Sequence, residues 1–267
     1  MPSENPTHKR KRGFRATLYR ARLGALRAVF GQVGGLLGLA EPEPTPEQVA
    51  SGEKLSRRDR RHRDLVRFIQ ERGVPAGLKT LDVGCAPGLL SERLFEAGYS
   101  DVKGCDWAAE ADLTERAREI VEYQKVDLNT DALSAYPDQG FGLVVCSDVL
   151  EHLENPTRMF REFERVLAPG GHVFFSVPNA FNLIERWRLL RSGNSGRYRS
   201  ERRAQPFGHI SMLPGEVIES LGDRAGLEVR AQGKGYVWWR GYFLLPGRVT
   251  SPLFSYVATY HLQRHGE

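Results

Sequence analysis

The stretch KTLDVGCAPGLLSERL, residues 79–94, combines the patterns of a strand, a tight turn and a helix. Thr80, Leu81 and Val83 predict a short buried strand, and the small residues of GCAPG let the backbone turn sharply. The apolar residues after the turn recur at helical spacing: Leu89, Leu90, Leu94 and Phe95. This order favours either an ordinary strand-to-helix connection or a loop that offers backbone N–H groups to a nucleotide-type cofactor.

The loop differs from a dinucleotide-binding fingerprint. It reads Gly84-Cys85-Ala86-Pro87-Gly88 and contains no G-x-G-x-x-G pattern. Asp82 lies just before the first glycine, where a carboxylate would repel a pyrophosphate but attract a cationic ligand. The loop therefore favours a positively charged nucleoside cofactor.

Further strands follow at the spacing of an α/β domain. Residues 102–106, 122–128, 140–147 and 172–177 read as strands, with a helix at 159–167. The continuous apolar run at 140–147 is typical of a parallel strand covered on both faces. Asp106 ends the second strand about twenty residues after the glycine loop, where an acid can accept hydrogen bonds from both ribose hydroxyls. The alternation predicts a doubly wound, mostly parallel α/β sheet.

The segments LDVGC, GCD, VDL, CSDVLEHL, LAPGG and VPN follow one another between residues 79 and 180. In this order they resemble the class I S-adenosylmethionine (SAM)-dependent methyltransferases, in particular the group of ubiquinone-biosynthesis O-methyltransferases and small-molecule methyltransferases. The resemblance implies a Rossmann-like, seven-stranded sheet whose last strand is antiparallel, with an N-terminal helical extension. Residues 227–237 and 256–262 are the expected sixth and seventh strands.

The resemblance also implies which residues bind SAM. Asp106 would hold the ribose, Trp107 would pack beside the adenine, and Asp127 would accept a hydrogen bond from the adenine amino group. Ala86 replaces the middle glycine of the family's GCGxG loop, which keeps the loop small. The complete expected set is Asp82, Gly84, Cys85, Ala86, Gly88, Asp106, Trp107, Asp127, Leu128 and Ser147.

Two acids and a histidine follow the fourth strand. Asp148, Glu151 and His152 are spaced i, i+3 and i+4, so a helical turn would place them on one face. An ordinary helix start, with acids at its positive end, has the same composition. The segment is similar to the E-x-x-E-H motif of methyltransferases that use a divalent ion, with Asp148 in place of the first glutamate. In those families a downstream histidine joins the site, and His209 is the nearest match.

This similarity predicts a Mg²⁺, Mn²⁺ or Zn²⁺ site formed by Asp148, Glu151, His152 and His209. Without a metal, His152 or His209 is the expected general base, because an imidazole titrates near neutral pH.

Charge is concentrated in three further regions. Residues 1–46 form a basic, amphipathic arm that ends in a Pro-rich linker; the pattern predicts a helix on an anionic membrane surface, a solvated tail or a targeting segment. The mixed-charge run at 57–63 is expected to be exposed.

Residues 47–267 are the expected methyltransferase domain, with a substrate-side insertion at 179–213. Apolar residues and arginines in that insertion favour a lid for an anionic acceptor or a solvated loop.

The three cysteines show no metal-ligand spacing and no obvious disulfide pairing, which fits a reducing, cytoplasmic environment. The net charge of +5 is modest for the whole chain. We expect SAM-dependent O-methylation of a small-molecule, glycan or lipid-linked anionic acceptor, by a cytoplasmic enzyme that contacts a membrane through its basic arm. One alternative is an RNA methyltransferase whose arginines contact phosphates, although no added RNA-binding module is recognisable. Another is a non-catalytic SAM-binding partner subunit, against which the intact set of acids and glycines argues.

Overall fold

The computed structural model describes residues 57–193, 208–234, 237–239, 242–245, 253 and 255–265. The basic arm, its linker and the arginines between residues 194 and 207 lie outside this part, so the expectations for them are not addressed by the fold. None of the helices in the described residues is both long and apolar enough to cross a membrane.

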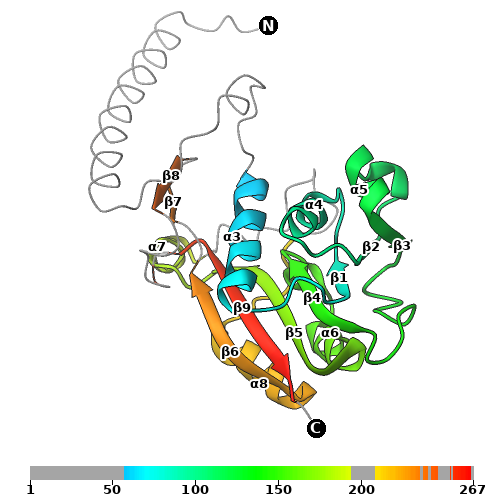
Figure 1. The fold of residues 1–267 in the computed structure, drawn as a ribbon. Coiled ribbons are helices and arrows are strands. Elements are labelled where there is room, and N and C mark those ends of the chain that lie inside the picture. The colour runs from blue at the N-terminus through cyan, green and yellow to red at the C-terminus, as the bar shows by residue number, and fades with distance from the viewer. Residues whose placement is uncertain are drawn as a thin grey trace, which may run out of the picture. The chain divides into compact units, whose positions relative to one another are not determined.

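Seven strands form one sheet in the order β3-β2-β1-β4-β5-β9-β6 (Figure 1). Strands β3, β2, β1, β4 and β5 run parallel to one another, whereas β9 runs antiparallel to both β5 and β6. Their bounds are β1 Thr80–Val83, β2 Val102–Asp106, β3 Val121–Lys125, β4 Phe141–Ser147, β5 Leu167–Pro178, β6 Leu227–Lys234 and β9 Val257–Arg264. The predicted seven-stranded sheet with an antiparallel last strand is confirmed.

A separate pair of short strands, β7 (Val237–Trp239) and β8 (Tyr242–Leu245), is antiparallel. The helices are α3 Arg57–Glu71, α4 Leu89–Glu96, α5 Glu115–Ile120, α6 Pro156–Val166, α7 Leu183–Ser192 and α8 Gly215–Ala225. Two short 3₁₀ helices, η1 (Glu110–Asp112) and η2 (Leu150–His152), follow β2 and β4.

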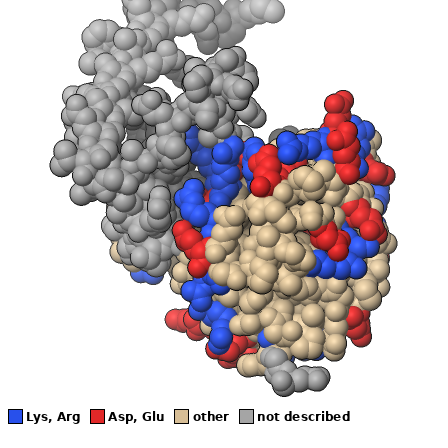
Figure 2. Space-filling view, in the orientation of Figure 1, with Lys and Arg blue, Asp and Glu red and all other residues tan. Residues whose placement is uncertain are grey.

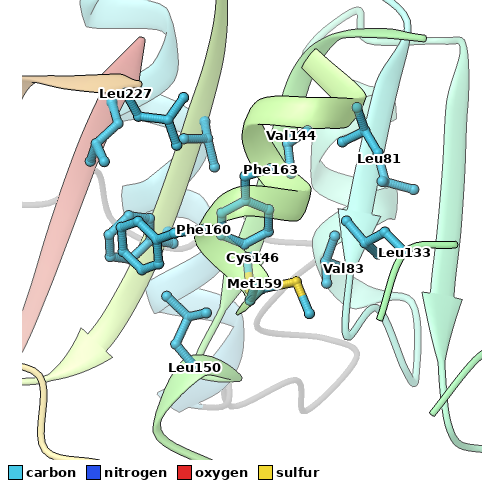
Figure 3. Packing of buried hydrophobic residues seen from close by; sticks show 14 of the residues in the cluster. Leu81, Val83, Leu133, Val144, Cys146, Leu150, Met159, Phe160, Phe163 and Leu227 are labelled. Carbon is cyan, nitrogen blue, oxygen red and sulfur yellow. The ribbon is translucent and has the colours of Figure 1, made fainter. Parts of the chain in front are cut away.

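Helices cover both faces of the sheet, which explains the continuous apolar sequence of β4. Val144 and Cys146 point into a core formed with α6 and α8, where Phe160 and Phe163 are fully buried (Figure 3). Leu143 and Val145 point to the other face and pack with residues of α3 and α4. Because the apolar side chains of β4 enter both cores, the alternation of polar and apolar residues seen in one-sided sheets is absent.

The charged run of α3 is partly buried, contrary to the expectation of an exposed run. Figure 2 shows basic side chains gathered in the area of α3. Asp59 and His62 are nevertheless buried, and Asp59 accepts hydrogen bonds from Arg63 at 3.1 Å and from Arg93 of α4 at 2.7 Å. The expectation was wrong because α3 lies against α4, where a buried carboxylate can be paired with arginine.

Several element boundaries also differ from the expectations, for example β6 and β9, which span Leu227–Lys234 and Val257–Arg264 where 227–237 and 256–262 were expected. β3 ends at Lys125, two residues before Asp127, because Asp127 already forms a turn in which its Oδ1 accepts a hydrogen bond from Asn129 N–H. α6 begins at Pro156, where Asn155 caps the helix by accepting from Arg158 N–H. β5 begins at Leu167, before the Pro-Gly-Gly turn, and its pairing with β4 shifts register there.

Candidate active site

The glycine loop, residues 84–88, connects β1 to α4 and packs between the segment after β4 and helix α5. Gly84 and Gly88 have φ angles of 75° and 101°, which an L side chain rarely adopts. A Cβ atom at Gly84 would collide with Val149, and one at Gly88 would collide with Ala117 of α5. Both positions therefore require glycine on conformational and steric grounds.

Asp106 joins this loop to the end of β2. Its buried carboxylate accepts one hydrogen bond from Ala86 N–H at Oδ2 and another from Ala108 N–H at Oδ1, each 3.0 Å long. A carboxylate oxygen has two lone pairs, so both oxygens can accept a further donor such as a ribose hydroxyl. The Tyr123 hydroxyl lies within hydrogen-bonding distance of the Asp106 and Ala108 carbonyl oxygens, at 2.9 and 2.6 Å, and holds this turn in place.

The remaining residues expected around the nucleoside lie at the ends of neighbouring strands. Trp107 directly follows Asp106, and 57 % of its surface is exposed. Asp127 is exposed beyond β3, and Leu128 packs partly buried against the main core. At the end of β4, Ser147 Oγ lies 3.0 Å from Ser176 Oγ of β5. These positions share the carboxyl edge of the sheet with the glycine loop, as the strand order requires.

Asp82 lies beneath the loop rather than on its surface. The residue is only 1 % exposed, and its Oδ2 accepts a 2.6 Å hydrogen bond from Ser91 Oγ of α4. Burial, opposed by the Ser91 hydrogen bond and assisted by the negative charge of Asp106, raises the pKa of Asp82 to about 7. Burial likewise raises the pKa of the Cys85 thiol far above neutrality, so this cysteine is not a thiolate nucleophile.

Three of the four expected metal-site residues come together after β4. Potential ligand atoms of Glu151, His152 and His209 all lie within 4.8 Å of one another. The two imidazole rings are 4.9 Å apart in an edge-to-face arrangement, and Glu151 is 1 % exposed. In the part of the chain that the structure describes, this is the group of acids and histidines with geometry suitable for a shared cation.

Backbone hydrogen bonds bring His209 to this cluster. The N–H groups of Ile210 and Ser211 both donate to the Glu151 carbonyl oxygen, at 2.9 and 3.0 Å. The Ser211 hydroxyl also donates to the Leu153 carbonyl oxygen at 2.8 Å. The segment that carries His209 is therefore docked onto η2.

Asp148 does not join the cluster. Its φ angle of 57° places it in the left-handed region, outside the three-residue helix η2, so the i, i+3, i+4 spacing of an α-helix does not apply. Its side chain forms an ion pair with Arg61 of α3, and its Oδ1 lies 3.4 Å from Ser176 Oγ. The predicted four-residue group is thus reduced to three.

Several contributors to this site were not recognised in the sequence. Arg61, Tyr123 and Val149 hold the loops in place, yet each looks like an ordinary surface or core residue in its own segment. Only their partners, which lie on other strands and helices, reveal what they do.

Exposed apolar side chains occur in two segments that follow β5. Ile210 and Met212 come shortly after His209 in the sequence. Beyond β5, the exposed residues are Phe181, Leu183, Trp187, Leu189 and Leu190, the last with 87 % of its surface exposed. Arg191 lies over the Trp187 ring at 5.3 Å, so a cation accompanies this apolar surface.

Comparison with known proteins agrees with this architecture. A family model described as "Methyltransferase domain" matches residues 55–232. The chain is 38 % identical over 115 residues to a ubiquinone biosynthesis O-methyltransferase of Ralstonia nicotianae, covering 41 % of this chain and 47 % of that protein. It is 36 % identical over 154 residues to the protein of the same name from Idiomarina loihiensis, covering 54 % and 63 %. The chain spans about half the length of the first of these relatives.

Solved structures show the same fold. A SAM-dependent methyltransferase from Mesorhizobium loti aligns with a TM-score of 0.50 at 19 % identity, covering 74 % of this chain and 98 % of that chain. Magnesium protoporphyrin IX methyltransferase from Synechocystis PCC 6803, solved with bound SAH, aligns with a TM-score of 0.52 at 18 % identity, covering 90 % and 99 %.

Proposed function

The chain belongs to the methyltransferase domain family and has the class I SAM-dependent methyltransferase fold, and from this premise we propose that it methylates an oxygen atom of its acceptor. One observation carries the proposal. Glu151 and His152, which follow β4, form a compact group with His209, and Val149 of the same segment packs on Gly84 of the glycine loop. This arrangement supports the proposal of a base beside the expected cofactor loop.

The residues at the carboxyl edge suit SAM. Asp106 has acceptor capacity left for the ribose hydroxyls, the largely exposed Trp107 could pack beside the adenine, and the glycine loop has the small residues that let a backbone approach a cofactor. When bound, SAM supplies a methyl group already activated by a sulfonium. The chain's own residues then have to orient the acceptor oxygen, remove its proton and exclude water.

His152 is the better of the two candidate bases. Its Nδ1 lies 3.2 Å from the Gly208 carbonyl oxygen, which can only accept a hydrogen bond. A neutral His152 therefore carries its proton on Nδ1, and Nε2 is left as the basic nitrogen. Nε2 would accept the proton of the acceptor hydroxyl.

The same three residues could instead hold a divalent ion. One carboxylate and two imidazoles suit Zn²⁺ or Mn²⁺, and a ligating histidine commonly donates its other N–H to a carbonyl, as His152 would to Gly208. Such an ion would acidify a bound hydroxyl. Metal analysis of the purified protein, followed by chelation and re-addition, tests this alternative.

The exposed apolar surface favours an amphiphilic acceptor. Leu183, Trp187 and Leu190 recur along one side of α7, and Arg191 provides a positive charge beside them. The two relatives are named as O-methyltransferases of ubiquinone biosynthesis, and a lipid-linked or anionic small molecule combines the apolar and polar chemistry that this surface suits. We infer that the acceptor carries an apolar portion and a polar or anionic portion.

The experiment uses the full chain, methyl-labelled SAM and separate lipid and aqueous extracts of cells. Labelled products are identified by mass spectrometry, and SAH binding is measured by calorimetry. We expect the label in a lipid-extractable methyl ether of a phenol or an enol. The His152→Gln variant should lose about 100-fold or more in turnover, with little change in SAH affinity. His265→Gln, at an exposed position, is the matched control. The absence of SAH binding by the wild-type chain would overturn the proposal.

A further inference from the structure

Arg61 and Asp148 connect two segments that are far apart in the sequence. Arg61 lies on α3, before the first strand, and Asp148 follows β4. Their ion pair is largely shielded, with side-chain exposures of 24 % and 15 %. Shielded pairs respond strongly to the removal of one partner, because the other charge is left desolvated. This contact therefore differs from the more exposed Arg67–Asp64 pair on the same helix.

Asp148 is held in an unfavourable backbone conformation. Few non-glycine residues adopt the left-handed region, so contacts from the surroundings must hold Asp148 in it. Two neighbours do so: Asp148 N–H donates to the Ser176 carbonyl oxygen at 3.0 Å, and the Arg61 guanidinium binds the side chain. The Ser176 hydroxyl, at 3.4 Å from Oδ1, gives a weaker contact.

The residues immediately after Asp148 belong to the site. Val149 occupies the space beside Gly84 of the glycine loop. Glu151 and His152 then form the cluster with His209. A change in the backbone at Asp148 would consequently move the contact with the cofactor loop and the candidate base together.

Helix α3, which carries Arg61, is held in place by contacts with α4 and with the core. Two residues earlier, the buried Asp59 accepts a 2.7 Å hydrogen bond from Arg93 of α4. The apolar side of α3 packs into the core through Leu65, Val66 and Ile69. Arg61 is thus carried by a helix that is fastened both to the sheet and to the helix after the glycine loop.

We propose that Arg61 is a positioning residue for methyl transfer, acting through Asp148 to hold the segment 148–152 against the glycine loop. The proposal rests on the proposed function of the same site. It assigns Asp148 to a structural contact with arginine instead of to the group that handles the acceptor proton. A displacement of about 1 Å in that group is enough to lower a reaction rate by roughly 100-fold.

The test compares Arg61→Gln, Asp148→Asn, the double variant and Arg61→Lys. Arg67→Gln is the matched control, because Arg67 lies on the same helix and pairs with Asp64 in an exposed i, i+3 contact. Turnover, acceptor KM, SAH affinity and melting temperature are measured for each. The imidazole NMR signals of His152 and His209 report on the cluster without requiring turnover.

We expect both single variants to lose about 10–100-fold in kcat and to shift the His152 signal in the same way. The double variant should be no worse than either single variant, because the two substitutions remove one shared interaction. Arg61→Lys should restore part of the loss, and Arg67→Gln should resemble the wild type.

Additive losses in the double variant would overturn the proposal. So would an Arg61→Gln defect confined to SAH affinity while Asp148→Asn is neutral, since Arg61 would then contact the cofactor itself. Unchanged histidine signals in both single variants would also refute it. A wild-type chain that binds SAH but methylates nothing would instead refute the proposed function, and the NMR comparison would still decide the coupling of Arg61 to His152.

Discussion

The Oδ2 atom of Asp106 accepts a 3.0 Å hydrogen bond from the backbone N–H of Ala86, so the end of β2 is joined directly to the glycine loop of β1. The same carboxylate caps Ala108 N–H through its other oxygen. The acid expected to bind a ribose therefore also shapes the loop around it, and its removal should have two separable effects.

Asp106→Ala should weaken SAH binding by roughly 2–4 kcal/mol, through loss of charge-assisted hydrogen bonds to the ribose and of the loop contact. Asp106→Asn keeps one acceptor oxygen and should show a smaller loss. Calorimetry with SAH measures the affinities, and Asp101→Ala, an exposed acid at the other end of β2, is the control. Equal affinities for wild type and Asp106→Ala would exclude Asp106 from the cofactor site.

Gly84→Ala should destabilise the protein and weaken cofactor binding. The added methyl group collides with Val149 at a φ angle of 75°, and overpacking of this kind costs roughly 1–3 kcal/mol in addition to backbone strain. Gly77→Ala is the matched control, because nothing lies within 4 Å of its added Cβ. Urea unfolding provides the comparison. Val149→Ala in the Gly84→Ala background should recover the steric part only, and no recovery would mean that the clash is not with Val149.

Asp82→Asn should alter the pH dependence of stability. The pKa of Asp82 is raised to about 7 from 3.8, so the folded state retains a proton that the unfolded state releases. The contribution of Asp82 to the free energy of unfolding is fully present below about pH 3.8 and is lost as the pH rises to about 7. The limiting slope of this loss is about 1.4 kcal/mol per pH unit.

The free energy of unfolding of Asp82→Asn, relative to that of wild type, should therefore increase as the pH rises from 5 to 8. Urea unfolding at unit pH intervals measures this difference. A difference that does not change with pH would show that Asp82 is ionised in the folded protein.

His261 should make the stability of the protein depend on pH in the opposite direction from Asp82. Burial, followed by the charges of His172, Arg72 and Arg230, lowers its pKa to about 3 from 6.5. The unfolded chain therefore binds a proton that the folded chain does not, and stability falls as the pH decreases below about 6.5.

His261→Phe retains a ring to stack on Phe174, which lies 4.2 Å from the imidazole centroid, and removes the titration. The fall in unfolding free energy between pH 7 and pH 5 should be smaller for His261→Phe than for wild type. His265→Gln should behave as wild type, because it removes an exposed histidine. An equally steep fall in His261→Phe would assign the acid sensitivity to another group.

The amino-acid sequence alone determined the order along the chain of the seven strands of the main sheet and the end of that sheet where the site lies. A strand buried on both faces, such as β4, must be apolar throughout, and a tight turn before a helix must contain small residues; both requirements are local and visible in the sequence. The placement of Gly84, Asp106, Glu151 and His152 at strand ends follows from them.

The tertiary structure alone decided what surrounds those residues. It buried Asp82 under α4, brought His209 to Glu151 through backbone hydrogen bonds, and paired Asp148 with Arg61 on a distant helix. Periodicity assumes regular backbone geometry, whereas Asp148 adopts a left-handed conformation that is maintained by contacts from α3 and β5. Such a conformation depends on partners that approach only when the chain has folded, so no pattern within residues 147–153 could reveal it.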